Sequence, residues 1–361
     1  MNLHLLPSSL KPLGLLLSIV FFTLQLSAGK HDQRLDIYWV DVEGGAATLL
    51  VTPAGESILI DSGNPGGRDA GRIHKVATEE AGLEQIDYLI TTHFHLDHFG
   101  GAAELAQLLP IKVVYDNGIP EQNPDNRPQD TRFPLLIKPY REMEVGERRR
   151  IHPGTELPIR PLDNGTPLRL ACLATRRQLS DTWATPRNKN LCSKAIPSKP
   201  KDVTDNANSV VMLLTFGEFR FFDAGDLTWN VEPTLACPDN IAGSTIDVYQ
   251  VTHHGLDRSN NPTLLEALAP TITVMNNGVT KGCGPETFAT LSGLPSAKAH
   301  YQVHKNLRAD SENNTQEAHI ANLSKDCEGH FIHLSVSPDG SNYTVSIPSR
   351  QHQRSFKTTK K

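Results

Sequence analysis

The sequence predicts an α/β sandwich in which two β-sheets pack face to face and helices cover their outer faces. Strand-like apolar runs open the chain, strands then alternate with helices, and this pattern repeats in the second half. The 361 residues fit one layered α/β domain. With 38% hydrophobic and 21% charged residues, the composition is that of a folded globular protein.

The first half opens as a β-meander with a Gly44-Gly45 turn. Ile73, Val76 and Ala77 fall on one helical face, and Pro110 stops a later helix. The predicted strands are residues 35–42, 46–52, 57–60, 86–91 and 111–115, and the predicted helices are 69–81 and 100–108.

Residues from about 117 to 205 are predicted to be an irregular insertion, with a set of short strands joined by long loops as the alternative for its first part, up to about 165. The insertion is rich in Pro, Arg, Asp and Asn and is interrupted by a strand at 168–175. Its Arg148-Arg149-Arg150 run is interpreted as a solvated charge patch, with contact to an anionic substrate as the alternative. The predicted strands that follow are 209–216, 218–223, 246–252, 271–275, 331–336 and 343–347, and the predicted helices are 228–236, 262–268 and 286–291. The domain is predicted to span 33–348, before a basic, disordered tail at 349–361.

Residues 1–28 are predicted to be a secretory signal peptide. Lys11 precedes an apolar run, and Ser27-Ala28-Gly29 supplies small residues for cleavage. The apolar run at 13–26 has about 14 residues, fewer than the ~20 that a membrane span needs, so a membrane anchor is the weaker alternative. We expect a secreted or periplasmic protein without stable membrane insertion once the signal is removed.

Five cysteines follow the predicted signal, and none forms a CxxC pair. In an oxidising compartment up to two disulfide bonds can form, and the pairings expected first are Cys172–Cys192 and Cys283–Cys327.

The run TTHFHLDHFGG follows a predicted strand and carries four candidate metal ligands. On an extended strand end, residues i and i+2 point the same way, so His93 and His95 can share one ion. Asp97 and His98 follow in a turn and can reach a second ion. Imidazole nitrogens and carboxylate oxygens are usual zinc ligands. A histidine-rich surface loop is the alternative interpretation.

Two more polar clusters end apolar strands: Asp226 closes FFDAGD, and His253-His254 close VYQVTHH. Such positions converge on one edge of a layered sheet, where six ligands suffice for two ions that share a carboxylate. Taken alone, Asp226 would be a turn or cap residue and His254 a structural one. Beside the first histidine cluster, a metal site is the favoured interpretation of both.

The motifs TTHFHLDHFGG, FFDAGDL and VYQVTHHG resemble those of the metallo-β-lactamase superfamily. Within it, the hydrolase domain of bacterial competence (DNA-uptake) proteins is most similar: DVEGGAATLLV resembles its opening motif, ILIDSG its second and DNANSVVMLLTFGEFRFFDAGDL its central block. The similarity runs from about residue 36 to 255, and more loosely to about 348. It implies a four-layered αββα sandwich and a dinuclear, usually zinc, site.

The resemblance also implies roles for individual residues. His93 and His95 would bind the first ion. Asp97, His98 and His254, or alternatively His253, would bind the second. Asp226 would bridge the two ions, and Asp61 would support the metal-binding loop. Many members have another histidine before the central strand, where this chain has Asn206 and Asn208. An asparagine or water would then complete the first ion, or a single ion would bind. Gly44 and Ala46 stand where the competence group has polar residues, so its exact substrate does not transfer.

These features predict a metal-dependent hydrolase in which a metal-bound hydroxide attacks a carbonyl or phosphorus centre and Asp97 or Asp226 orients it. The expected cofactor is two Zn²⁺ ions, although one ion, manganese or iron also suits these ligands. The chain has no GxSxG, P-loop or GxGxxG motif that would indicate another chemistry.

Three functions remain open. The first is hydrolysis of phosphodiesters, with nucleic acid as a substrate only, because a net charge of −5 and 6% aromatic residues disfavour tight nucleic-acid binding. The second is hydrolysis of small esters, lactones or lactams. The third is a non-catalytic binding protein on a degenerate metallohydrolase scaffold. The sequence does not predict the oligomeric state.

Overall fold

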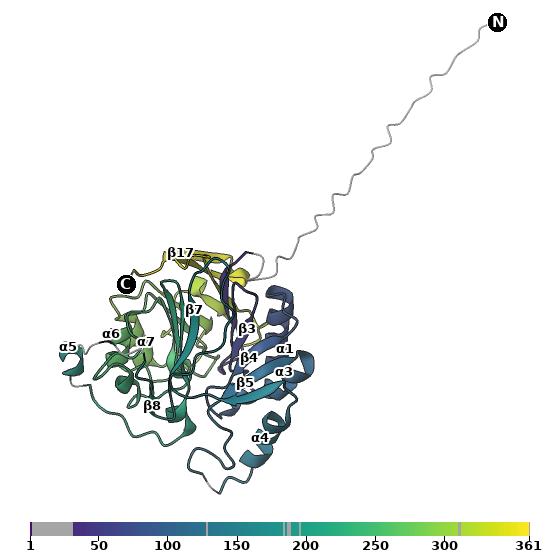
Figure 1. Ribbon diagram of the computed structural model, residues 1–361. Helices are drawn as coiled ribbons and strands as arrows, with labels where there is room; N and C mark the ends of the chain where they lie inside the picture. The colour runs from purple at the N-terminus through teal and green to yellow at the C-terminus, as the bar shows by residue number, and fades with distance from the viewer. Residues whose placement is uncertain are drawn as a thin grey trace.

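The computed structural model describes Met1 and residues 32–127, 129–182, 185, 189–194, 196–309 and 312–360. Two β-sheets pack face to face there, and helices lie on both outer faces (Figure 1), which confirms the predicted sandwich. Nearly all of the predicted signal peptide lies outside the described residues. Within them, no helix has the length and apolar character that crossing a membrane requires.

The first sheet carries most of the N-terminal half and the C-terminal strands. Its order is β17-β16-β15-β1-β2-β3-β4-β5-β6. Strands β3, β4, β5 and β6 run parallel, so their carboxyl ends lie at one edge. The strands are β1 (Leu35–Trp39), β2 (Thr48–Val51), β3 (Ser57–Ile60), β4 (Ile86–Ile90), β5 (Ile111–Asp116), β6 (Glu147–Arg150), β15 (Ile332–Val336), β16 (Asn342–Ile347) and β17 (His352–Lys357).

The second sheet has the order β14-β13-β12-β11-β10-β9-β7-β8. The predicted hairpin is its β9–β10 pair, and β10 to β14 run parallel, so their carboxyl ends also share an edge. The strands are β7 (Leu168–Thr175), β8 (Gln178–Leu179), β9 (Val211–Phe216), β10 (Phe219–Asp223), β11 (Val248–Gln250), β12 (Ile272–Met275), β13 (Ala299–His304) and β14 (Ile320–Asn322).

Helices α1, α3 and α4 cover the outer face of the first sheet, and α6 and α7 that of the second (Figure 1). Between the sheets lies an apolar core in which Trp39 and Phe221 meet edge to face, with ring centroids 5.9 Å apart. The helices are α1 (Arg68–Lys75, continued by a π-helical turn at Val76–Glu80), α2 (Leu96–Phe99), α3 (Ala102–Leu108), α4 (Phe133–Glu142), α5 (Lys189–Cys192), α6 (Pro262–Leu268) and α7 (Pro285–Ser292).

The predicted irregular insertion at 117–205 is wrong in part, because it contains helix α4, whereas strand β6 agrees with the alternative of short strands joined by long loops. Pro134 starts the first turn of α4 and Pro139 lies inside it, so the proline content that predicted a loop is accommodated in a helix. The Arg148–Arg150 run lies in β6, the outermost strand of the sheet, where its side chains remain mostly exposed.

The prediction of a disordered tail at 349–361 is also wrong from His352 to Lys357. These residues form β17, which pairs antiparallel with β16. Phe356 is buried and stacks on Tyr343 with ring centroids 5.3 Å apart.

Both predicted disulfide pairings are wrong. The structure joins Cys192 to Cys237, with Cα atoms 5.7 Å apart, and leaves Cys172, Cys283 and Cys327 as thiols. Cys172 lies inside the core between the sheets, where Cys192 does not reach it.

Candidate metal centre

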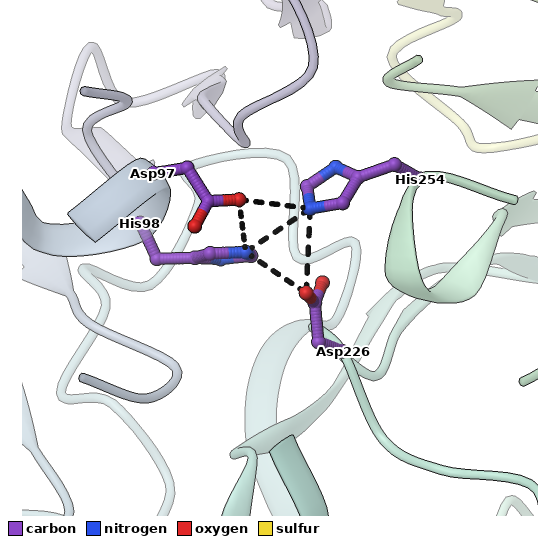
Figure 2. Close-up of side chains that lie close together, drawn as sticks. All are labelled: Asp97, His98, Asp226 and His254. Atoms are coloured by element: carbon purple, nitrogen blue, oxygen red, sulfur yellow. Dashed lines mark hydrogen bonds and ion pairs between the residues drawn. The ribbon is translucent and has the colours of Figure 1, made fainter. Parts of the chain in front are cut away.

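The carboxyl ends of strands from both sheets meet at one edge of the sandwich and bring the predicted ligands together. The TTHFHLDHF segment follows β4, Asp226 follows β10, and His253 and His254 follow β11. Figure 2 shows Asp97, His98, Asp226 and His254 pointing at one another from these elements.

The Gly44-Gly45 turn after β1 contacts the loop that carries the candidate histidine ligands. The Ala46 amide donates to the Asp97 carbonyl oxygen at 3.0 Å. A Cβ atom at Gly45 would lie only 2.5 Å from that oxygen, so the close approach requires glycine. On the other side, the Phe94 amide donates to Asp205 Oδ2 at 2.7 Å.

One group of four side chains surrounds a point beside Asp226. His98 Nε2 and His254 Nε2 lie 3.2 Å and 3.3 Å from Asp226 Oδ2, and 3.2 Å from each other. Asp97 Oδ2 lies 3.4 Å from His98 Nε2 and 3.2 Å from His254 Nε2. This is the set predicted for the second ion.

A second group of ligand atoms, from His93, His95 and Asp226, lies next to it, with all three within 4.8 Å of one another. His93 Nε2 lies 3.9 Å from Asp226 Oδ2, so Asp226 faces both groups, as a bridging carboxylate would. His95 Nε2 is 2.8 Å from Asp125 Oδ1, so this nitrogen already has an acidic partner.

His253 also faces Asp226, from a different side than His254. Both residues have left-handed backbone conformations, with φ of 57° and 55°, and this lets sequence neighbours aim at one carboxylate. His253 Nε2 lies 3.4 Å from Asp226 Oδ2 and 3.3 Å from Asn206 Nδ2. Asn206 therefore lies at the site, whereas Asn208 Nδ2 donates to Asp205 Oδ1.

Hydrogen bonds behind the ligands fix the tautomers of His98 and His93. Asp61 Oδ2, as predicted for a supporting residue, lies 2.7 Å from His98 Nδ1, so that nitrogen donates. Asp61 also accepts from the Thr92 hydroxyl, which leaves Thr92 Oγ1 as acceptor for His93 Nδ1 at 3.1 Å. The Nε2 atoms of both histidines therefore point into the site.

The two histidines that follow β11 are also anchored through Nδ1. His254 Nδ1 is 3.1 Å from the Asn276 carbonyl oxygen and must donate to it. Ser259 donates its hydroxyl to the Leu227 carbonyl, so its oxygen accepts from His253 Nδ1. Four imidazoles thus turn their Nε2 atoms toward Asp226, as metal-binding histidines do when the other nitrogen is anchored.

The pKa shifts of Asp226 and His98 also fit a centre that binds cations. Burial raises the pKa of Asp226, but facing His254, His98 and His253 outweigh it and lower that pKa well below the usual value. Burial lowers the pKa of His98, yet Asp226, Asp61 and Asp97 together raise it well above 6.5. The buried carboxylates therefore draw positive charge to His98, where a metal ion would supply it.

Three buried polar atoms at this centre have no hydrogen-bond partner, and this also fits a metal site. His93 Nε2, Asp226 Oδ1 and Asn206 Oδ1 are buried without a hydrogen-bond partner. Orphaned donors and acceptors of this kind are costly unless a ligand satisfies them. Their imidazole and carboxylate chemistry matches zinc and related divalent ions. The role of each residue as a ligand stays a prediction.

Sequence reasoning missed three residues here. Asp125 contacts His95, Asp205 holds the Phe94 amide, and the Lys281 ammonium group contacts Asp97 Oδ2. Asp125 and Lys281 come from loops without a motif, so no local signal pointed to them.

Comparisons with known proteins agree with this geometry. The metallo-beta-lactamase superfamily model matches residues 40–170. A UPF0173 metal-dependent hydrolase from Koribacter versatilis is 36% identical over 85 residues, which is 23% of this chain and 31% of that protein. Another, from Herpetosiphon aurantiacus, is 39% identical over 74 residues, or 20% of this chain and 27% of that protein.

The chain thus spans about a third of the length of these curated relatives. Among solved structures, CmlA, a diiron β-hydroxylase from Streptomyces venezuelae, is 17% identical, with 68% of this chain and 45% of that chain covered and a TM-score of 0.37. The more specific resemblance to competence proteins stays a prediction. Residues 40–170, about a third of this chain, thus match the metallo-beta-lactamase superfamily model, and the two-sheet sandwich agrees with the fold that this similarity implies.

Proposed function

We propose that this protein is a metal-dependent hydrolase that cleaves phosphodiesters. One observation carries the proposal: four anchored imidazoles turn their Nε2 atoms toward the shared carboxylate Asp226. The names of the two curated relatives, both metal-dependent hydrolases, support it.

Divalent ions bound here would polarise the scissile group and lower the pKa of a water molecule so that it can act as nucleophile. His93, His95 and Asp226 would hold one ion, and Asp97, His98, His254 and Asp226 the other. Asp97 and Asp226 would accept a hydrogen bond from the attacking water and orient it.

Lys281 at the centre, together with a cavity lined in part by basic residues of which Lys199 pairs with Glu286, supports an anionic substrate. Lys281 contacts Asp97 and keeps 39% of its side chain exposed, so its ammonium group can also meet a substrate oxygen. A cavity of about 300 Å³ is lined by Lys199, Lys201 and Arg258, and by Thr228 and Trp229 shortly after Asp226. The competence-type motifs favour nucleic acid as the source of such a phosphodiester.

The test is hydrolysis of bis-p-nitrophenyl phosphate by the purified protein, before and after chelation, together with its metal content. We expect activity that is lost on chelation and restored by added Zn²⁺ or Mn²⁺. Asp226→Asn should lose activity and metal, whereas His152→Ala, which changes an exposed histidine away from the centre, should keep both.

Other outcomes redirect or reject the proposal. If the protein binds metal but hydrolyses only esters, lactones or lactams, these would replace phosphodiesters as the proposed substrate class. A folded protein that binds no metal would reject catalysis and favour a binding role. We also propose export to an oxidising compartment, which the Cys192–Cys237 disulfide supports.

A further inference from the structure

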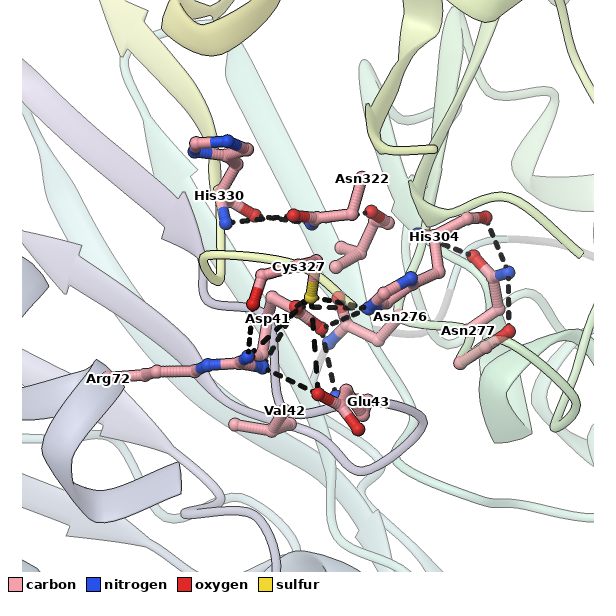
Figure 3. A network of polar contacts seen from close by, with 12 residues as sticks. Asp41, Val42, Glu43, Arg72, Asn276, Asn277, His304, Asn322, Cys327 and His330 are labelled. Carbon is pink, nitrogen blue, oxygen red and sulfur yellow. Dashed lines mark hydrogen bonds and ion pairs between the residues drawn. The ribbon is translucent and has the colours of Figure 1, made fainter. Parts of the chain in front are cut away.

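A second group of ligand-type side chains lies outside the candidate centre, where the two sheets come together (Figure 3). Asp41 follows β1 of the first sheet, His304 ends β13 of the second, and Cys327 lies between β14 and β15. Their ligand atoms all lie within 4.8 Å of one another. Three distant segments therefore meet through an oxygen, a nitrogen and a sulfur.

The geometry of the group is compact. His304 Nε2 lies 2.9 Å and 3.0 Å from the two Asp41 carboxylate oxygens. Cys327 Sγ lies 3.2 Å from Asp41 Oδ2 and 3.7 Å from His304 Nε2, so the sulfur faces both partners. Asp41 and His304 are buried, and Cys327 is partly exposed.

Charged side chains surround the group. Arg72 Nη1 pairs with Asp41 Oδ2 at 3.0 Å and with Glu43 Oε1 at 3.2 Å, and Glu43 also pairs with Arg68 at 2.6 Å. A divalent ion bound here would take the place of the proton on the Cys327 thiol.

A separate observation also points to a missing ligand. Figure 3 draws Asn276 with this group, and its chain neighbour Asn277 donates to the His304 carbonyl oxygen at 2.7 Å. The Asn276 side chain is buried, yet neither the amide nitrogen nor the oxygen has a hydrogen-bond partner. A buried amide left unsatisfied is costly, and an ion at this position would use its oxygen.

We propose that Asp41, His304 and Cys327 bind a single divalent ion of the zinc class, with Asn276 or Glu43 nearby to complete the ligand set. Thiolate, imidazole and carboxylate together suit zinc, because soft sulfur disfavours magnesium and calcium. The ion would cross-link β1, β13 and the loop before β15, and so join the two sheets. A cavity of about 220 Å³, lined in part by Cys327 and Asn322, gives it a route to solvent.

Cobalt distinguishes this site from the candidate metal centre, because only this site offers sulfur. We expect Co²⁺ titration of the metal-free full-length protein to produce thiolate-to-cobalt charge-transfer absorption in the near ultraviolet, saturating at one ion per chain. Cys327→Ser should abolish this absorption and His304→Ala should weaken Co²⁺ binding at this site. In both variants the visible bands from cobalt at the candidate centre should remain.

Cys172→Ala is the matched control, because it removes a buried thiol that lies in the apolar core and donates to the Ala174 carbonyl oxygen, and it should leave the absorption unchanged. Absence of the charge-transfer band from cobalt-loaded wild-type protein would overturn the proposal, as would its persistence in Cys327→Ser. If that variant fails to fold, the rate at which iodoacetamide alkylates Cys327 in the wild-type protein tests the proposal instead. Protection by Zn²⁺, reversed by chelation, would support the site, and an unchanged rate would reject it.

Discussion

His98 Nδ1 and Asp61 Oδ2 lie 2.7 Å apart, and this contact determines which nitrogen His98 turns toward the centre. Asp61 has a left-handed backbone, with φ of 61°, and also accepts from the Thr92 amide at 2.8 Å. One carboxylate at the end of β3 thus orders the loop at the end of β4. The residue that orients His98 and the loop that carries it therefore follow two neighbouring parallel strands, β3 and β4.

Replacing Asp61 by Asn should weaken metal binding without unfolding the protein. The asparagine oxygen can still accept from Thr92, but its amide group would face His98 Nδ1 and favour the wrong tautomer. We expect metal affinity to fall roughly 10- to 100-fold, as is typical when such a partner is lost. Zn²⁺ titration with a competing chelator measures it.

Asp36→Asn is the control, because Asp36 lies 2.8 Å from His333 Nε2 in a similar Asp–His pair away from the centre. It should leave the metal affinity unchanged. Equal affinities for Asp61→Asn and wild type would show that Asp61 does not orient His98.

Lys281→Ala should raise KM for an anionic phosphodiester by roughly 2- to 5-fold, the range for a partly exposed charge contact, with a smaller change in kcat. The physical reason is loss of an ammonium group beside Asp97. Steady-state kinetics with bis-p-nitrophenyl phosphate check it, and the exposed Lys298→Ala serves as control. An equal rise in KM for a neutral ester would contradict a role for the lysine charge.

Glu232 should make the protein less stable as pH rises from about 5 to 8. Burial raises its pKa from 4.5 to about 7, although the amides of Asn260 and Asn261 donate to it. The unfolded carboxyl therefore releases its proton at lower pH than the folded one, and raising the pH favours unfolding. The full contribution is on the order of 3 kcal/mol.

The Glu232→Gln variant cannot ionise, so its free energy of unfolding should decline less across this pH range. At pH 5 it should already be less stable than wild type, because one backbone amide loses its acceptor. Urea titrations at pH 5 and pH 8 give the difference. Parallel curves for the two proteins would show that Glu232 does not contribute the pH dependence.

Removing the Cys192–Cys237 disulfide by the double Cys→Ala change should lower the free energy of unfolding by roughly 2–4 kcal/mol. The bond closes a loop with a sequence separation of 45, so its loss gives the unfolded chain more freedom. Urea unfolding of the variant and of reduced wild type should agree. If reduction leaves the unfolding midpoint of wild type unchanged, the cross-link does not stabilise the fold.

The sequence predicted the fold and the gathering of the ligands because both follow from local patterns. His93 to His98 are contiguous and follow an apolar strand, so strand geometry alone brings them to a sheet edge. Asp125 and Lys281 lie 30 and 184 positions from their partners, and no local pattern can reveal such contacts.

The missed elements have equally physical reasons. Along β17 Phe356 is the buried residue of an otherwise polar edge strand, so its sequence looks like a solvated tail. The disulfide depends on how α5 packs beside the loop after β10, which spacing between cysteines does not determine. Pro139 is tolerated inside α4, although proline usually ends a helix.

The consecutive left-handed conformations of His253 and His254 have a consequence for assembly. Each costs on the order of 1–2 kcal/mol in an isolated chain, so the unfolded protein rarely adopts this turn. It becomes stable only when β10 and β11 have paired and Ser259 and Asn276 hold the two rings. An ion that needs His254 would then bind the native state alone, so by mass action its binding would shift the folding equilibrium toward the native state as its concentration rises.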